Sequence, residues 1–181
     1  MKALLTTTIV LFAGLSACTT APTPSSESRR DLMAGEVERT ITLLQELDPG
    51  MKNFFESSVA YAVFPNVGKG GFGIGGAYGR GILFEDGTMV GYCDIAQGTI
   101  GFQAGGQAFR EVIFFESEAA LDRFKGGEFS LSAQASAVAV EAGASTTTDY
   151  SNGVAVFTLT RAGLMFEASV GGQTFNYAPL R

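Results

Sequence analysis

Few side chains in this 181-residue sequence have the types and spacing that chemistry requires. Histidine is absent, which removes the side chain that titrates near neutral pH, and with it the usual Ser-His and Cys-His nucleophile pairs and most zinc or haem sites. The aspartates and glutamates are scattered, and no pair of them has a placement that demands acid–base catalysis. We therefore expect a protein that is not an enzyme and that holds neither a metal nor a cofactor.

Cys18 is one of two cysteines, and its surroundings indicate a modification rather than a disulfide. It follows Met1-Lys2, an apolar run over residues 3–14 and the small-residue stretch Leu15-Ser16-Ala17, an order that is typical of a signal peptide. Leu-Ser-Ala-Cys also resembles the bacterial lipoprotein signal. In that signal the thiol receives a diacylglyceryl group, cleavage occurs before the cysteine, and the new amino terminus is acylated, for example with palmitate. We expect Cys18 to be the site of lipid attachment.

The residue after Cys18 bears on the destination of the protein. This residue is Thr19 and not an Asp, which resembles the pattern of lipoproteins sent to an outer membrane. We expect a lipid-anchored protein of the bacterial cell envelope, at the outer membrane and facing the periplasm. The alternative is a secretory signal cut near Ala17, with a chance cysteine behind it.

Charge and glycine spacing bear on nucleic acids and nucleotides. The net charge is −6 and the longest basic run is Arg29-Arg30, so the clustered cations that bind nucleic acid are missing. The glycine-rich run of residues 68–81 contains the G-x-G-x-x-G spacing of dinucleotide sites twice, but a turn at Asp86-Gly87 follows it instead of a helix. No Gly-Lys-Ser/Thr ends the run. We expect neither nucleic acid nor nucleotide as a partner.

The sequence divides into three parts. Residues 1–17 form the signal peptide, residues 18–28 are rich in Thr, Ser, Pro and Ala and suit a flexible tether, and residues 29–181 are long enough for one domain. Cys93 lies in an apolar run without a basic neighbour, which predicts a buried and unreactive thiol.

Three helices are predicted in the domain. Apolar residues at spacings of three and four predict a helix over residues 31–47, and Asp48 followed by Pro49 predicts the start of a second, shorter helix that extends to Ser58. A third helix is predicted between an N-cap at Ser117 and a C-cap at Gly126.

The rest of the domain carries strand signals. Short apolar and aromatic stretches are separated by turn residues, and Asp86-Gly87 and Asn152-Gly153 are typical centres of two-residue hairpin loops. Residues 131–142 fit either a helix or a strand, of which we favour the strand. Glycine pairs inside strands predict bends, bulges or close approaches. The expected fold is α+β, with a strongly curved antiparallel, possibly barrel-like sheet, two N-terminal helices and one inserted helix.

A family resemblance lies in residues 60–72 (AYAVFPNVGKGGF), followed by Gly75-Gly76 and by Gly79-Arg80-Gly81. This order resembles the opening signature of the SYLF domain, an actin-regulator and lipid-binding type of domain. Two elements of many eukaryotic members, Trp-Ser-x-Pro and Gly-Pro-x-Gly-Arg, are absent from this sequence. The resemblance covers the chain from Asp31 onward.

The resemblance implies a non-catalytic domain that binds membrane phospholipids. The basic residues nearest the signature are Lys52, Lys69 and Arg80, which are the candidate lipid-binding residues. Two other functions stay open: a structural or interaction protein of the envelope without direct lipid recognition, and a carrier of a small apolar ligand inside the curved sheet.

Overall fold

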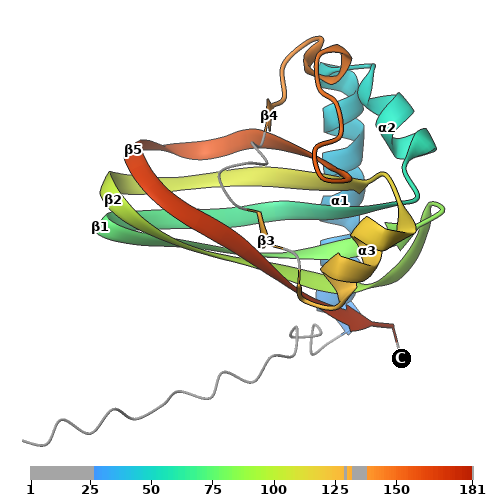
Figure 1. Cartoon of the computed structure of the whole chain (residues 1–181), viewed down its shortest axis with the longest axis horizontal. Helices are drawn as coiled ribbons and strands as arrows, with labels where there is room; N and C mark the ends of the chain where they lie inside the picture. Colours follow the sequence, from blue (N-terminus) through green and yellow to red (C-terminus); the bar gives the residue numbers. More distant parts are fainter. Residues whose placement is uncertain (1–26, 129, 132–137, 181) are drawn as a thin grey trace, which may run out of the picture.

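The computed structural model describes residues 27–128, 130–131 and 138–180, and Cys18 with the expected signal peptide lies outside them. The elements, in chain order, are α1 (Glu27–Leu47), α2 (Met51–Ser57), β1 (Ala60–Glu85), β2 (Thr88–Phe115), α3 (Glu118–Lys125), β3 (Ser130–Leu131), β4 (Val138–Ala139), a 3₁₀ turn η1 (Ala144–Thr146) and β5 (Val154–Pro179). The expected α+β class, with two N-terminal helices and one inserted helix, is confirmed (Figure 1).

The sheet has five strands in the order β1-β2-β5-β3, with β4 also paired to β5. All pairings are antiparallel except that of β4 with β5. The possible closure into a barrel is not seen: within the described residues, β1 pairs only with β2 and forms an open edge. The sheet is curled because its long strands bend back on themselves, and it is not closed because no pairing joins β1 to the strands at the other edge of the described sheet.

Three long strands take the place of the many short strands that the sequence predicts. β1, β2 and β5 have 26, 28 and 26 residues, and pairing continues through the glycines, as between Gly76 and Gly98. Figure 1 shows each strand running to the end of the sheet away from α2 and α3, bending there and returning. The glycines therefore do not end strands but allow the strands to fold over.

Contacts within β1 show how closely the two halves of the folded sheet approach. A Cβ atom on Gly79 would lie 2.7 Å from the Val67 side chain, and one on Gly81 would lie 2.5 Å from the Val63 carbonyl oxygen. The prediction that strand glycines mark bends and close approaches is confirmed at these two positions. Beyond the bend, the hairpin to β2 has positive φ angles at Asp86 and Gly87, as its turn residues predict.

The curled sheet has two hydrophobic cores, one on each face. The inner core lies between the two halves and is closed by Leu121 and Phe124 of α3, against Phe64, Phe115 and Phe175 of the sheet. The outer core lies between the sheet and the first two helices; it contains Val37, Leu44, Met51, Val63, Val112, Phe114 and Phe157. Burial on both faces explains why successive residues of these strands are apolar instead of alternating with polar ones.

The helices end close to the predicted residues, but two of them begin elsewhere. α1 begins at Glu27, four residues before the predicted start at Asp31 and within the last two residues of the predicted tether. α3 has Ser117 as N-cap and Gly126 as C-cap, as predicted. α2 begins at Met51 with Gly50 as N-cap, because Asp48 forms a turn instead: its carboxylate accepts hydrogen bonds from the backbone N–H of Gly50 at 3.0 Å and of Ser145 at 2.7 Å. Segment 131–142, for which we favour a strand, contains the last residue of β3, Leu131, and the whole of β4, Val138–Ala139; residues 140–142 are not in a strand, and residues 132–137 lie outside the description.

Candidate functional site

An arginine groove runs between α1 and the outer face of the sheet. It consists of two adjoining pockets with volumes of about 590 and 390 Å³, which share Glu36, Arg39 and Pro65 in their linings. Five arginines line the two pockets together: Arg29, Arg39, Arg80, Arg110 and Arg161. In a chain with a net charge of −6, such a concentration of cations marks this groove as a candidate for binding an anion.

A β-bulge shapes the floor of the groove. The pairing of β1 with β2 shifts register between Phe64 and Val67, so Pro65 and Asn66 leave the regular ladder. Proline lacks a backbone N–H, which confines it to edge strands and bulges, and β1 is an edge strand. Pro65 lines both pockets, so the bulge brings strand β1 to the place where the two pockets meet.

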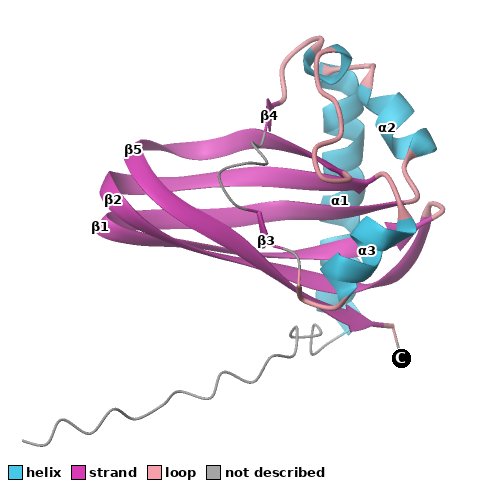
Figure 2. Cartoon of the chain, in the orientation of Figure 1, coloured by secondary structure: helices cyan, strands magenta, loops and turns pink. Residues whose placement is uncertain are grey.

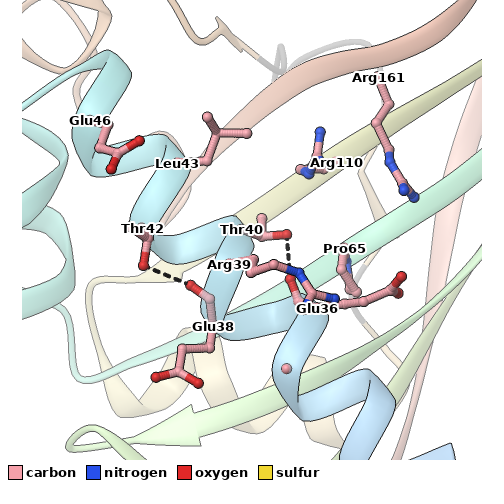
Figure 3. A pocket seen from close by; sticks show the side chains of 11 residues that line it. Glu36, Glu38, Arg39, Thr40, Thr42, Leu43, Glu46, Pro65, Arg110 and Arg161 are labelled. Carbon is pink, nitrogen blue, oxygen red and sulfur yellow. Dashed lines mark hydrogen bonds between the residues drawn. The ribbon is translucent and has the colours of Figure 1, made fainter.

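Arg110 and Arg161 form the part of the groove with the clearest electrostatic signature. Arg110 is on β2 and Arg161 on β5, and Figure 3 shows both side chains on the sheet side of the pocket. The pKa of Arg110 is lowered by burial and by repulsion from Arg161, while Glu36 opposes this effect. Within the described residues, neither guanidinium has a hydrogen-bond or ion-pair partner. Two neighbouring cations that repel each other, an effect that Glu36 offsets only in part, favour the binding of an anion.

Acidic side chains of α1 define where such an anion could lie. Glu36, Glu38 and Glu46 line the larger pocket together with Arg39. In Figure 3, Glu38 points away from the two arginines, whereas Glu36 and Arg39 extend toward them. Glu36 is half-buried and is the acidic group that acts on Arg110. The positive part of the groove is therefore its sheet side, around Arg110 and Arg161.

The structure separates the three residues that the sequence singled out for lipid binding. Lys52 is exposed on α2 and forms an ion pair with Glu56 at 3.6 Å, outside the groove. Lys69 lines a different pocket, between the two halves of the sheet. Arg80 lines the groove, and its Nε donates a hydrogen bond to the Tyr78 hydroxyl at 3.2 Å. Arg80 is thus the one of the three that the groove includes.

Sequence reasoning missed Arg39, Arg110 and Arg161. Each of the two sheet arginines shares its outward face with apolar neighbours at a spacing of two, Val112 and Phe114 for Arg110, and Leu159 and Phe157 for Arg161. In the sequence, each of these two arginines is a single cation that follows an apolar strand face. This pattern does not show that the two arginines are neighbours, because they are far apart in the sequence.

The interlayer pocket, between the two halves of the sheet, is the second site. Its volume is about 250 Å³, and its lining is mostly polar: Lys69, Gln97, Gln107, Phe109, Glu111, Thr158, Thr160 and Gln173. The sequence Gly-Gly-Gln-x-Phe occurs twice, at residues 105–109 and 171–175. The two copies supply Gln107 and Gln173 to this pocket and Phe109 and Phe175 to the inner core. Such a lining does not suit the small apolar ligand that the carrier hypothesis requires.

Glu111 and Gln173 are the buried polar pair of the interlayer pocket, with 1% and 9% of their surfaces exposed. Gln173 Nε2 donates a hydrogen bond to Glu111 Oε2 at 3.1 Å, and the Oε1 atoms of both side chains have no partner. Burial raises the pKa of Glu111 to about 7, although the hydrogen bond from Gln173 opposes the shift. If Glu111 Oε1 carried a proton, it could donate a hydrogen bond to Gln173 Oε1, and both of these oxygens would then have a partner.

Cys93 and the carboxylates that could bind a metal ion are the remaining chemical groups of the described residues. Cys93 is buried, and its pKa is raised by burial and by the neighbouring Asp94, which agrees with the unreactive thiol that the sequence predicts. Among the described residues, no group of three or more Cys, Asp or Glu side chains could hold a metal ion. None of the described helices is long and apolar enough to cross a membrane.

Comparison with known proteins gives the family. No curated protein matches this chain. Residues 96–177 match the family described as Ysc84, Las17-binding protein actin regulator, whose domain is the SYLF domain. The matched segment contains both sheet arginines of the groove and the Glu111–Gln173 pair, whereas α1 and β1 precede it. The match agrees with the SYLF family that the sequence indicates and shows a Ysc84 (SYLF) domain segment over residues 96–177; the signature at residues 60–81 lies before it.

Proposed function

We propose that this chain is a lipid-anchored, non-catalytic protein of the bacterial envelope whose Ysc84 domain binds membrane phospholipids. The observation that carries the proposal is the pair Arg110 and Arg161, two neighbouring cations in one groove. Neither forms a hydrogen bond or an ion pair with a described residue, although Glu36 acts on Arg110 electrostatically. A phosphate group offers oxygens that a guanidinium can bind with two parallel hydrogen bonds. We propose that the lipid phosphate binds at these two arginines.

The groove also offers apolar contacts that suit the rest of a phospholipid. Leu43 and Pro65 line the larger pocket, and Leu32 and Met33 line the adjoining one. A lipid phosphate carries a glycerol and acyl chains, which need apolar walls next to the cationic site. This combination supports a lipid phosphate over a free anion or a nucleic acid.

Lipid attachment at Cys18 would keep the domain close to a membrane. Glu27, the first residue of α1, is nine positions after Cys18. An extended chain spans ~3.3 to 3.6 Å per residue, so the domain would start within roughly 30 Å of the lipidated cysteine. Two or more acyl chains give stable anchoring. The proposed location is the outer membrane, on the periplasmic side.

We expect replacement of the two sheet arginines to weaken binding to anionic vesicles. A cation close to an anionic surface contributes ~1 kcal/mol, so Arg110→Gln and Arg161→Gln should each lower the affinity about fivefold. The measurement is co-sedimentation of residues 18–181 carrying Cys18→Ser, which removes the acyl anchor, with anionic and zwitterionic vesicles over a salt series.

Lys52→Gln is the matched control for these variants, because it removes one positive charge outside the groove. We expect it to change the affinity less than twofold. If Lys52→Gln and the arginine variants weaken binding equally, the groove is not the phosphate site. If the parent protein binds no vesicle of either kind, direct lipid binding is wrong and the interaction-protein alternative replaces it.

A separate prediction concerns the anchor. We expect the full-length precursor with Cys18→Ser to lose incorporation of labelled palmitate, because the thiol that initiates lipid modification is gone. Most of the protein should then leave the membrane fraction when cells are fractionated in high salt. A Cys18→Ser precursor that still partitions wholly with membranes would argue against acyl anchoring.

A further inference from the structure

Phe72 and Ile74 lie where strand β1 folds back, and we call this pair the crest of the sheet. Their exposed fractions, 88% and 72%, are the highest of the large hydrophobic side chains that the structure describes. A Cβ atom on Gly71 would collide with Gly75 and with the Ile74 carbonyl, so β1 turns sharply here. The register of β1 with β2 also shifts between Phe72 and Ile74. The crest is therefore a narrow, convex bend that carries two bare apolar side chains.

The strands around the crest are almost free of charge. β1 has no charged residue between Lys69 and Arg80, and β2 has none between Asp94 and Arg110. In residues 162–175 of β5, which pair with residues 95–108 of β2, Glu167 is the only charged residue. A chain with 30 charged side chains in its 181 residues, 12 basic and 18 acidic, thus keeps one end of its sheet nearly neutral. A surface that enters hydrocarbon must be nearly free of charge, because the transfer of an ion out of water is costly.

The position of the crest leaves it accessible. Figure 2 shows the described helices and loops gathered at one end of the sheet, and at the other end only strands. The same face of β1 leads from the crest to Tyr78, whose hydroxyl accepts a hydrogen bond from Arg80, and Arg80 lines the arginine groove. At ~3.3 Å per residue, Arg80 lies roughly 20 Å along the strand from Ile74. Tyr and Arg are residues that suit the headgroup region of a membrane.

The size of the crest indicates which partner it fits. A stable interface between proteins buries ~800 Å² on each partner, and its core is flat or concave enough to exclude water. Two side chains on a convex bend offer far less area than that, since a large aromatic side chain buries only ~150 to 250 Å². A bilayer needs no complementary shape, and a small apolar projection is enough to enter it.

We propose that the crest inserts Phe72 and Ile74 into the apolar edge of a phospholipid bilayer. The inference rests on the proposed phospholipid binding and adds a second contact to it: the groove binds phosphate, and the crest enters the membrane.

The chain contains no tryptophan, so a single introduced tryptophan reports its own environment. In the Cys18→Ser protein, Phe72→Trp places the probe on the crest. Leu180→Trp places it at another exposed apolar position, of 48% exposure, beside the first residues of β2, where the Leu180 backbone N–H donates a hydrogen bond to the Val90 carbonyl. With anionic vesicles, we expect a blue shift of Phe72→Trp emission and quenching by lipids brominated on their acyl chains. Leu180→Trp should show neither effect.

A loss of affinity tests the same inference without a probe. We expect Phe72→Ser combined with Ile74→Ser to weaken vesicle binding about tenfold or more, because the apolar area no longer leaves water. Leu180→Ser should change it less than twofold. Because the replaced side chains are exposed, an unchanged circular dichroism spectrum and unfolding midpoint are expected for every variant.

The outcomes separate the crest from the proposed function. If the parent protein binds vesicles but Phe72→Trp emission does not shift, the crest proposal is overturned while phospholipid binding stands. If the double serine variant binds vesicles normally but loses a concentration-dependent dimer, the crest is a surface for a second copy and the proposal is overturned. If the parent protein binds no vesicles, the proposed function itself has failed.

Discussion

Gly81→Ala will destabilise this protein by about 3 kcal/mol, the upper part of the range for overpacked sites. The added methyl group would lie 2.5 Å from the Val63 carbonyl oxygen and 2.8 Å from a ring carbon of Phe64. Both neighbours belong to the first half of β1, so relief would require the two halves of the folded strand to separate. The free energy of unfolding from urea titration measures the effect.

Gly68→Ala is the matched control, because Gly68 lies on the same strand and a Cβ atom there would meet nothing within 4 Å. It should leave the free energy of unfolding nearly unchanged, or raise it by up to ~1 kcal/mol through the lost flexibility of the unfolded chain. If both alanine variants are equally stable, the close approach of residues 63 and 81 is wrong, and the folding of β1 over itself must be revised.

Glu111→Gln will make the protein more stable than the parent by about 3 kcal/mol at pH 8, and no more stable at pH 4. The pKa of Glu111 rises from 4.5 to about 7 on folding because the carboxyl group is buried, and each pKa unit corresponds to ~1.4 kcal/mol. The folded state therefore holds the proton more tightly than the unfolded state. The stability that this bound proton contributes to the folded state is complete below pH 4.5 and is lost as the pH rises through about 7.

The pair geometry explains why the glutamine should be tolerated at every pH. A protonated carboxyl or an amide at position 111 can donate a hydrogen bond to Gln173 Oε1 and accept one from Gln173 Nε2. Both Oε1 atoms that lack a partner beside a charged carboxylate would then be satisfied. Lys69 is the other charged side chain that lines the pocket. Urea titrations of both proteins from pH 4 to pH 8 measure the difference.

Exposed Glu141→Gln serves as the control for the loss of one carboxylate. It should follow the parent protein over the whole pH range, while the curve of Glu111→Gln diverges from the parent between pH 4.5 and 7. A constant difference between Glu111→Gln and the parent would contradict a buried carboxyl that is protonated on folding.

Local signals in the sequence were sufficient for the existence of the three helices, for the ends of α3 and for the turns. The boundaries of α3 follow from Ser117 and Gly126, and the positive φ angles of Asp86, Asn152 and their glycines follow from the steric needs of two-residue turns. The start of α2 was misplaced because Asp48 uses its carboxylate for Ser145, a residue almost one hundred positions away. A local pattern contains no information about such a partner.

The candidate site was predicted only in part, and the reason is again the range of the interactions. Arg80 was singled out because it lies beside a recognisable motif, and it does line the groove. Arg110 and Arg161 have no motif around them, and their mutual repulsion exists only because β2 and β5 are neighbours in the sheet. Lys52 was an equally plausible cation in the sequence, but α2 holds it away from the groove.

The sequence by itself determined the mixed α and β class, the lack of histidine chemistry and the position of the glycines within strands. Those properties depend on composition, periodicity and the backbone freedom of single residues. The tertiary structure alone decided that β1 folds over itself at Gly71–Gly75, that five arginines meet in one groove, and that Phe72 and Ile74 remain bare. The packing of segments that are distant in the sequence decides which residues become neighbours and which are buried from solvent.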